Sequence, residues 1–367
     1  MSPDTGASRR RHGAAAALVA LLLATVALAA CGGGPGEETG QTVPAAGDGT
    51  IFGYNEAITP ADSEGDDLIA ESGAAFVRIP MAWATLEPTE GARNWEPYDA
   101  INDELESVGL RPLWTLTSAP CWAADVNCET TPPGLGVSAD HIDAYADLAA
   151  EVADRYPDAI GLEIWNEPNI PNFWRPTPDA DLYRQLLSAS ADAVHEGDSD
   201  VPVVMAGPSP TTTEQVAEDP EKIGFVDFIT TVMQGPDAPD VDAIGLHPYS
   251  LLQVGTDPVD ESVRLYEEGR DAAAAVAPGI PVWVTEVGLT TAGQYAITPE
   301  EQADGLERIV KAFADDGVPV ISIHRFFDQL DPPLKFEEGF GVVESDRATK
   351  KPAFCSAADA LGAECTP

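Results

Sequence analysis

The stretch GLEIWNEPN, residues 161–169, starts as an apolar run and ends on a carboxylate set between Asn166 and Pro168. Its first residues have the composition of a buried strand. It follows HIDAYADLAAEVADRY at 141–156, whose apolar residues recur with helical spacing. Packing of an apolar core does not explain a glutamate at the end of a strand, so Glu167 needs another explanation. The stretch therefore predicts an α/β protein with chemistry at the end of a strand.

Strand-like runs of this kind occur eight times along the chain: IFGYN from 51, FVRIP from 76, RPLWTLT from 111, GLEIWN from 161, VPVVMAG from 201, VDAIGLHPY from 241, PVWVTEVG from 281 and VPVISIHRF from 318. Amphipathic helical patterns lie between them, and AFCSAADALGA at 353–363 can serve as the eighth helix. Eight such units over roughly 300 residues match the count and size of a single (β/α)8 TIM barrel. A doubly wound α/β sheet also fits the alternation, but no glycine-rich phosphate turn follows the first run.

The chain is strongly acidic. Of its 367 residues, 62 are Asp or Glu and 19 are Lys or Arg, which gives a formal net charge of −43 at pH 7. Such a surface repels DNA, RNA and anionic lipid, so we expect no nucleic-acid partner. The acidity is typical of a solvated surface adapted for solubility or salt, whereas a surface for cations or basic partners would require clustered sites.

The N-terminal region has the pattern of an export signal. Three arginines at 9–11 precede the apolar run AAAALVALLLATVALAA, which leads directly into Cys31. The residues LAAC at the end of this run resemble the lipobox of bacterial lipoproteins, in which the cysteine is lipidated. A plain signal peptide that is cleaved elsewhere, or an uncleaved anchor helix, also fits the pattern. We expect an exported protein, either anchored to the outer face of the cytoplasmic membrane through Cys31 or secreted, with no other membrane contact.

The domain boundaries follow from this pattern. The segment after Cys31 is rich in glycine and polar residues and cannot bury enough surface to fold, which predicts a flexible tether. The predicted organisation is a signal peptide at 1–30, a lipoprotein tether at 31–50 and one barrel domain at 51–367. For a tethered barrel we expect a monomer.

The remaining cysteines form two local pairs, as export to an oxidising compartment favours. Cys121 and Cys128 are close in sequence, as are Cys355 and Cys365, and each pair would close a short loop with a disulfide. A metal site made from these four is the alternative, but neither pair has CxxC spacing or a nearby histidine. We expect neither a metal nor a cofactor.

A second strand-like run also ends on a glutamate. PVWVTEVG, the seventh run, carries Glu286 near its end, three βα units after Glu167. In an eight-stranded barrel the ends of strands four and seven lie on different sides of the ring, so the two side chains can converge over its mouth. Two facing carboxylates are the requirement for glycoside hydrolysis. Either glutamate alone would be weak evidence, because a glutamate at a strand end is more often a solvated or ion-paired surface group.

These motifs resemble a known group of enzymes. WNEP at 165–168 and WVTEVG at 283–288 look like the acid/base and nucleophile motifs of clan A glycoside hydrolases, which are retaining barrel enzymes. The run at 76–123 is similar to strands two and three of this clan, and EIWNEPNIPNFWRPTPDADLYRQLL at 163–187 is similar to family 39. Family 39 is the most similar family, with family 5 next.

The resemblance implies a retaining double displacement. Glu286 would be the nucleophile and Glu167 the acid/base, with carboxyl groups about 5 to 5.5 Å apart. The charge of Glu286 is expected to raise the pKa of Glu167. Arg78 and Tyr249 match positions that support the nucleophile, and Asn166 matches the residue that binds the sugar 2-hydroxyl. Arg78 as a structural ion pair and Asn166 as a turn cap are the alternatives.

Further site residues are expected near the strand ends. His247 should point to the mouth if the strand phase holds, as a sugar contact or as a core histidine. Aromatic rings are the usual platforms for sugar faces, and seven cluster near strand ends or the loops that follow: Trp83, Trp114, Trp122, Trp165, Phe173, Trp174 and Trp283. Among these we predict substrate contacts for Trp122 and Trp174.

The eighth run departs from the clan pattern. It ends SIHRFFDQLDP, where many clan members have a tryptophan beneath the bound sugar. Phe326 is predicted to replace that tryptophan, with Phe327 as the alternative. The nearby His324 and Asp328 are candidates for polar contacts with the sugar.

The sequence thus predicts a secreted retaining β-glycoside hydrolase that acts on an oligo- or polysaccharide. A catalytically silent glycan-binding lipoprotein could use the same scaffold, although two ionisable groups that face each other cost stability without benefit to a binding module. A transglycosylase would use the same residues, and only its products would distinguish it from a hydrolase.

Overall fold

The computed structural model describes residues 49–56, 63–124, 126, 134–250, 256–329 and 335–367. These residues belong to one compact unit, Thr42–Pro367. The predicted signal peptide and all but the end of the predicted tether, with Cys31, lie outside the described residues, as does Cys128. Their predicted roles therefore remain predictions.

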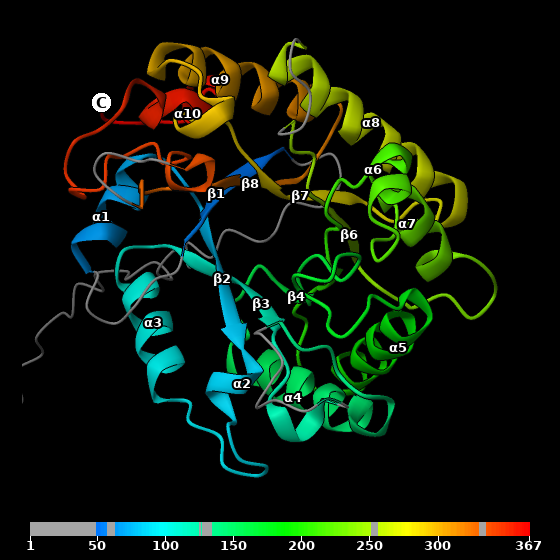
Figure 1. Ribbon diagram of the computed structural model, residues 1–367. Coiled ribbons are helices and arrows are strands. Elements are labelled where there is room, and N and C mark those ends of the chain that lie inside the picture. The colour runs from blue at the N-terminus through cyan, green and yellow to red at the C-terminus, as the bar shows by residue number, and fades with distance from the viewer. Residues whose placement is uncertain (1–48, 57–62, 125, 127–133, 251–255, 330–334) are drawn as a thin grey trace, which may run out of the picture. The chain divides into compact units, whose positions relative to one another are not determined.

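Eight parallel strands close into a barrel in sequence order (Figure 1). They are β1 Ile51–Asn55, β2 Phe76–Ala82, β3 Arg111–Thr117, β4 Gly161–Ile164, β5 Val203–Met205, β6 Ala243–Leu246, β7 Val282–Val287 and β8 Val320–His324. Seven of the strands lie within the predicted runs, and β2 continues two residues past FVRIP to Ala82. β1 closes the barrel against β8, with Ile51 opposite Val320. The predicted (β/α)8 TIM barrel is confirmed, and the doubly wound sheet is excluded.

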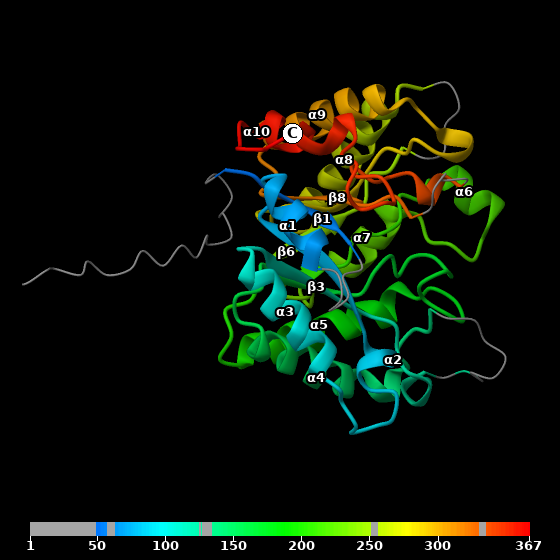
Figure 2. The same ribbon diagram turned by 90° about the vertical axis from the view of Figure 1, so that its left-hand side faces the viewer.

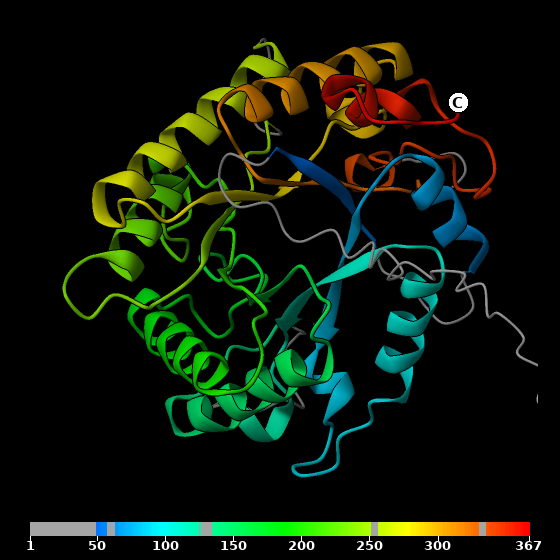
Figure 3. The ribbon, with the colours of Figure 1, turned by 180° about the vertical axis from the view of Figure 1, so that it is seen from behind.

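Helices surround the strands, as Figure 1 and the view from behind in Figure 3 show. They are α1 Ser63–Glu71, α2 Trp83–Leu86, α3 Glu96–Ser107, α4 Ile142–Arg155, α5 Ala180–Glu196, α6 Thr213–Glu218, α7 Phe225–Met233, α8 Pro258–Val276, α9 Pro299–Asp315 and α10 Ser356–Leu361. Local sequence explains their starts: before α9, the Thr298 side chain accepts from the Glu301 N–H while Glu301 reaches back to the Thr298 N–H. In Figure 2 the view is turned so that α1 and α3 face the reader.

The barrel interior is apolar at one end and polar at the other. A layer at the strand starts consists of Phe76, Leu113, Ile160, Val204, Ala243, Trp283 and Val320. Gly161 makes room for it, because a Cβ there would lie 3.0 Å from the Trp283 ring. Side chains alternate along a strand, so inward positions recur two residues further on. Five of these next positions are polar: Arg78, Thr115, Glu163, Thr285 and Ser322. The apolar layer is therefore the floor beneath a polar site.

Two further predictions concern covalent links and membranes. The Cys355–Cys365 disulfide is present, with an S–S distance of 2.01 Å, and it closes the chain around α10. The Cys121–Cys128 pair stays a prediction, because Cys128 is not described. Within the described part of the chain, no helix has both the length and the apolar character needed to cross a bilayer.

Candidate active site

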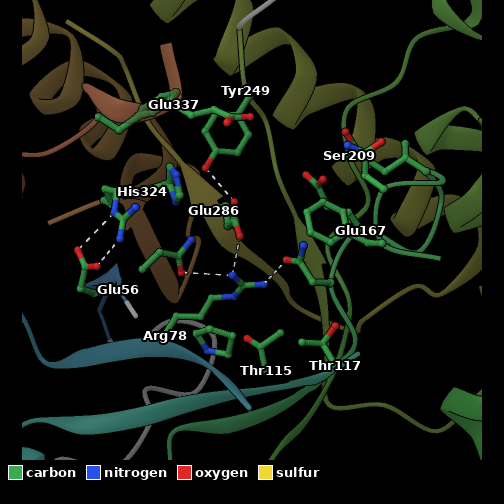
Figure 4. A pocket seen from close by; sticks show the side chains of 18 of the residues that line it. Glu56, Arg78, Thr115, Thr117, Glu167, Ser209, Tyr249, Glu286, His324 and Glu337 are labelled. Carbon is green, nitrogen blue, oxygen red and sulfur yellow. Dashed lines mark hydrogen bonds and ion pairs between the residues drawn. The ribbon is translucent and has the colours of Figure 1, made fainter. Parts of the chain in front are cut away.

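A cavity of about 740 Å³ lies over the polar end of the barrel. Both predicted catalytic glutamates line it, together with Arg78, Asn166 and Tyr249. Figure 4 shows Glu167 and Glu286 projecting into the same space, the first from the turn after β4 and the second from β7. The structure therefore brings together, in one cavity, side chains that are up to about 200 positions apart in sequence.

The chain turns sharply where β4 ends, and this turn aims Glu167. Trp165 and Glu167 have φ angles of 83° and 44°, a left-handed conformation that side chains rarely adopt. Trp165 is held in place by two hydrogen bonds, from its N–H to the Leu116 carbonyl at 2.9 Å and from its indole to the Phe173 carbonyl at 2.9 Å. Strained backbone of this kind persists only where the surroundings enforce it, and here it turns the Glu167 carboxyl over the mouth.

Glu286 is surrounded by donors and positive charge. Arg78 Nη1 donates to Oε1 at 2.6 Å, and the Tyr249 hydroxyl donates to Oε2 at 2.9 Å. Burial raises the pKa of Glu286, but the positive charges of His247 and Arg78 outweigh it and hold the pKa at about 2. The carboxylate is thus ionised at any physiological pH, as a nucleophile requires. The expected supporting contacts of Arg78 and Tyr249 are present.

The pKa of Glu167 is shifted in the opposite direction, upward. Burial raises the pKa of this carboxyl; a hydrogen bond with His247 lowers it in part, and the charge of Glu286 adds to the rise. The neighbouring charge of Glu286, which the sequence predicted as the cause, is therefore a smaller contribution than burial. One oxygen of Glu167 lies within 4.8 Å of one of Glu286. That distance suits the closely spaced pair of a retaining enzyme, which is about 5 to 5.5 Å, and not the wider pair of an inverting one.

His247 directly follows β6, and its ring lies between Glu167 and Glu286. Its Nδ1 is 3.1 Å from Glu167 Oε1 and 4.0 Å from Glu286 Oε2, and its Nε2 is 3.1 Å from the Thr285 hydroxyl. The ring fits only because Gly207 has no side chain, since a Cβ there would lie 2.3 Å from it. Burial lowers the pKa of His247, but the charges of both glutamates outweigh this effect and raise it. His247 therefore orients Glu167; of the two predicted roles, the buried histidine is the one observed.

Glu163 was missed by the sequence analysis. It lies in β4, is fully buried, and accepts from Arg78 Nε at 2.6 Å, from Thr115 Oγ1 at 2.9 Å and from the Gly207 N–H at 3.3 Å. Arg78 also donates through Nη2 to Asn166 Oδ1 at 2.8 Å. The Arg78 guanidinium thus donates to the buried Glu163 carboxylate through Nε and to Glu286 through Nη1. A glutamate within an otherwise apolar strand was the signal, because a buried carboxylate requires a cation.

A second ion pair at the rim was also not predicted. Arg325, just after β8, pairs with Glu56, just after β1, and both line the cavity. His324 lines the cavity too, as expected. Asp328 does not: it is buried and paired with Lys351 at 3.2 Å. Its predicted sugar contact is therefore wrong.

The three aromatic residues predicted to contact substrate are absent from the cavity wall. Trp174 is 2% exposed and packs against Trp165, with ring centroids 5.0 Å apart. It is covered because residues 134–137 run alongside, with Gly136 so close that a Cβ would lie 2.7 Å from the indole. Trp122 donates its indole N–H to the Glu87 carbonyl at 3.0 Å. Trp174 is thus buried and Trp122 is half-buried, and neither ring lines the cavity.

Phe326 is likewise a core residue. Its ring is fully buried and packs against Tyr54 at 4.8 Å and Phe354 at 6.0 Å. The alternative, Phe327, is also buried. Among the residues that the structure describes, four other aromatic residues line the cavity together with Tyr249: Phe173, Tyr295, Phe336 and Phe340.

Replacing Phe326 by Ala is expected to reduce the free energy of unfolding by about 3 to 5 kcal/mol, because it empties a filled core position. Denaturant unfolding of the purified protein measures this change. The matched control is Phe173→Ala, an exposed ring whose loss should change the free energy by no more than about 0.5 kcal/mol. A small stability change for Phe326→Ala, combined with weaker substrate binding, would show that Phe326 contacts the sugar and is not a core residue.

Three of the described residues could jointly offer donor atoms to a metal ion. They are Glu167, His247 and Glu286, whose donor atoms all lie within 4.8 Å of one another. The hydrogen bonds of these groups to Arg78, Tyr249 and Thr285 already account for their positions. Glycoside hydrolysis by a pair of carboxylates requires no metal.

The barrel and its paired glutamates define a class: the glycoside hydrolases of clan A. The chain belongs to glycosyl hydrolase family 5, because the model of the family Cellulase (glycosyl hydrolase family 5) matches residues 37–322. The motifs of the sequence resemble family 39 more than family 5. It is the family 5 model that matches, while solved structures of both families share the fold.

The chain is also similar to individual proteins. A β-galactosidase from an Arthrobacter species is 29% identical over 143 residues, which covers 33% of this chain and 21% of that protein. The chain thus spans about a fifth of the length of this curated relative.

Solved structures agree in fold. A family 39 glycoside hydrolase from Bacteroides cellulosilyticus WH2 superposes with a TM-score of 0.60 at 22% identity, covering 84% of this chain and 63% of that one. A GH5_18 protein from Streptomyces cattleya in complex with GlcNAc gives 0.65 at 20% identity, covering 86% and 80%. The exo-β-1,4-mannosidase of Opitutaceae bacterium strain TAV5 gives 0.63 at 17% identity, covering 86% and 60%.

Proposed function

We propose that this protein is a retaining β-glycosidase that hydrolyses neutral oligo- or polysaccharides. The observation that carries the proposal is the Glu167 and Glu286 pair. Their oxygens lie within 4.8 Å, and their pKa values are displaced in opposite directions, one raised and the other held at about 2. Two carboxyls with separated pKa values are an acid and a nucleophile at the same pH. A silent binding module would gain nothing from this arrangement.

The first step transfers the sugar to the enzyme. The Glu286 carboxylate attacks the anomeric carbon, and the bond from that carbon to the leaving-group oxygen breaks as Glu167 gives this oxygen its proton. Arg78 and Tyr249 hold the attacking carboxylate through both of its oxygens. Asn166 uses its amide oxygen to accept from Arg78, so its N–H group remains to donate to a sugar hydroxyl.

The second step releases the sugar. Once Glu286 is bound to the sugar it has no charge, and the pKa of Glu167 falls. Glu167, now ionised, takes a proton from water, and the water oxygen attacks the anomeric carbon and displaces Glu286. Two inversions retain the β configuration.

The charges of the cavity favour neutral sugars. The two arginines that line it are both paired, Arg78 with Glu163 and Glu286, and Arg325 with Glu56. Among the described residues of the cavity wall, neither guanidinium is left to meet a carboxylate or sulfate on the substrate. An anionic sugar would lose its water without gaining a counter-charge, and it would approach a chain of formal net charge −43.

We propose, from residues 1–50, that the protein is exported and acts at the cell surface. The arginines at 9–11, the apolar run and the lipobox-like LAAC before the glycine-rich segment support this location. Mass spectrometry of Cys31 in protein purified from membranes would detect the lipid, and an unmodified Cys31 would refute the anchor.

Wild-type protein assayed with aryl β-glycosides of glucose, galactose, mannose, N-acetylglucosamine and glucuronic acid tests the proposed function. We expect hydrolysis of at least one neutral glycoside, with the β anomer appearing first in NMR spectra of the reaction. The glucuronide should react at least roughly tenfold less efficiently, because it lacks a counter-charge in the cavity.

Other results of these assays would contradict the retaining mechanism or favour one of the two alternative functions. An α anomer as first product would contradict the retaining mechanism. Folded protein that binds these sugars but hydrolyses none would favour the silent glycan-binding lipoprotein. Preferential transfer to an added sugar acceptor would identify a transglycosylase that uses the same two glutamates.

A further inference from the structure

The cavity has two unlike sides around Glu286. The side that carries Glu167 is built by the loops after β4 and β5, and its wall includes Ile170, Asn172, Phe173, Ser209 and Pro210. The other side is built from β1 and β8 and includes Asn55, Glu56, His324, Arg325 and Gln329. Figure 4 shows Glu167 and Ser209 on one side of Glu286, and Glu56 and His324 on the other.

The chemistry of the proposed function assigns a part of the substrate to each side. Glu167 gives its proton to the leaving-group oxygen, so that oxygen must come within hydrogen-bond reach of its carboxyl. The group attached to this oxygen therefore lies on the Glu167 side of the cavity. The sugar that is transferred to Glu286 lies over Arg78 and towards the β1 and β8 side.

Phe173 is the large apolar group on the leaving-group side. Its side chain is 37% exposed, and among the described residues it is the one large hydrophobic residue that is exposed. An exposed apolar ring forgoes the free energy that burial would supply, and this ring lines the cavity, where a bound ligand would cover it. The neighbouring Trp174 is fully packed, so the exposure of Phe173 is specific to this position.

The backbone of Phe173 is fixed although its ring is open. Its carbonyl accepts from the Trp165 indole at 2.9 Å, and its N–H donates to the Ile170 carbonyl at 3.2 Å. Trp165 immediately precedes Asn166 and Glu167, so the position of Phe173 is tied to that of the proton donor. An exposed ring whose backbone is fixed beside the proton donor is suited to stacking on the flat face of a pyranose.

We infer that Phe173 is the platform for the sugar on the leaving-group side, and that the natural leaving group is itself a sugar. This inference rests on the proposed function. The substrate class is accordingly a β-linked oligo- or polysaccharide, with at least one sugar unit beyond the bond that is cleaved.

Glycosyl fluorides and disaccharides of the same transferred sugar provide the test. A fluoride ion is too small to reach Phe173, whereas the second sugar of a disaccharide would stack on it. Wild type, Phe173→Ala and Phe173→Trp are assayed on β-glucosyl, β-galactosyl and β-mannosyl fluoride, and on cellobiose, lactose and mannobiose. The quantity compared is the kcat/KM for the disaccharide divided by that for the matching fluoride.

We expect Phe173→Ala to lower this ratio about five- to tenfold, the size of one aromatic contact, and Phe173→Trp to restore it. Gln185→Ala, on the exposed surface of α5 and away from the cavity, is the control whose ratio should equal that of wild type. An unchanged ratio in Phe173→Ala, or equal losses on both substrates, would overturn the assignment of Phe173 alone. Wild type that cleaves none of these fluorides and none of the neutral aryl β-glycosides would overturn the proposed function and this inference with it.

Discussion

Glu286→Ala is expected to reduce kcat on aryl β-glycosides by about 10⁵-fold, because it removes the group that forms the covalent intermediate. The lost carboxylate leaves a space beside the anomeric carbon, still bordered by Arg78 and Tyr249. Added azide or formate should enter this space and restore part of the rate. Azide would attack from the face that Glu286 used, so the product would be the α-glycosyl azide, identified by NMR.

The control for this variant is Glu286→Gln, which fills the same space with a side chain that cannot attack. It should be as inactive as the alanine variant, and azide should not rescue it. Activity in Glu286→Ala close to that of wild type, without added nucleophile, would remove Glu286 from the role of nucleophile.

Glu167→Ala is expected to have an effect that depends on the leaving group. A poor leaving group requires the proton, so kcat/KM on a disaccharide should fall by about 10² to 10⁴-fold. A dinitrophenyl group leaves without a proton, so the first step on that substrate should be nearly unaffected. Azide should then accelerate turnover by attacking the sugar bound to Glu286, which gives the β-glycosyl azide. The two variants therefore differ in the configuration of their azide products.

The pH dependence follows from the raised pKa of Glu167. The first step requires Glu167 to be protonated, so the wild-type kcat/KM on a disaccharide should fall as pH rises through that pKa. Burial raises this pKa above its ordinary value, and the active form therefore persists to higher pH than for an exposed glutamate. Glu167→Ala assayed on the dinitrophenyl glycoside should lack this alkaline fall. An identical alkaline fall in variant and wild type would assign it to another group.

The positions of Glu167 and Glu286 could be predicted because they depend on local patterns. An apolar run, then a carboxylate, marks the end of β4 and of β7, and the barrel topology brings such ends to one rim. The supporting roles of Arg78 and Tyr249 came from the resemblance to clan A, and the contacts agree with it. Glu163 could have been added from strand alternation, since it lies two residues after the inward-facing Gly161.

The aromatic predictions failed for a physical reason. Trp174 and Phe173 are adjacent in sequence, yet one is buried and the other faces the cavity. Residues 134–137, from the loop before α4, cover Trp174 through the hydrogen bond from the Gly136 N–H to the Arg175 carbonyl at 3.0 Å. No pattern local to residues 173–174 contains that information.

The sequence by itself determined the eight βα units and the placement of Glu167 and Glu286 at strand ends, because apolar periodicity is a property of neighbouring residues. Only the tertiary structure decided which aromatic rings meet the cavity and how Glu163 and Arg78 hold Glu286. Those contacts join segments far apart in the chain, such as Phe340 and Tyr249, whose rings lie 5.9 Å apart. The direction of a side chain in a loop is set by what packs against it, and the packing partners are fixed only when the barrel closes.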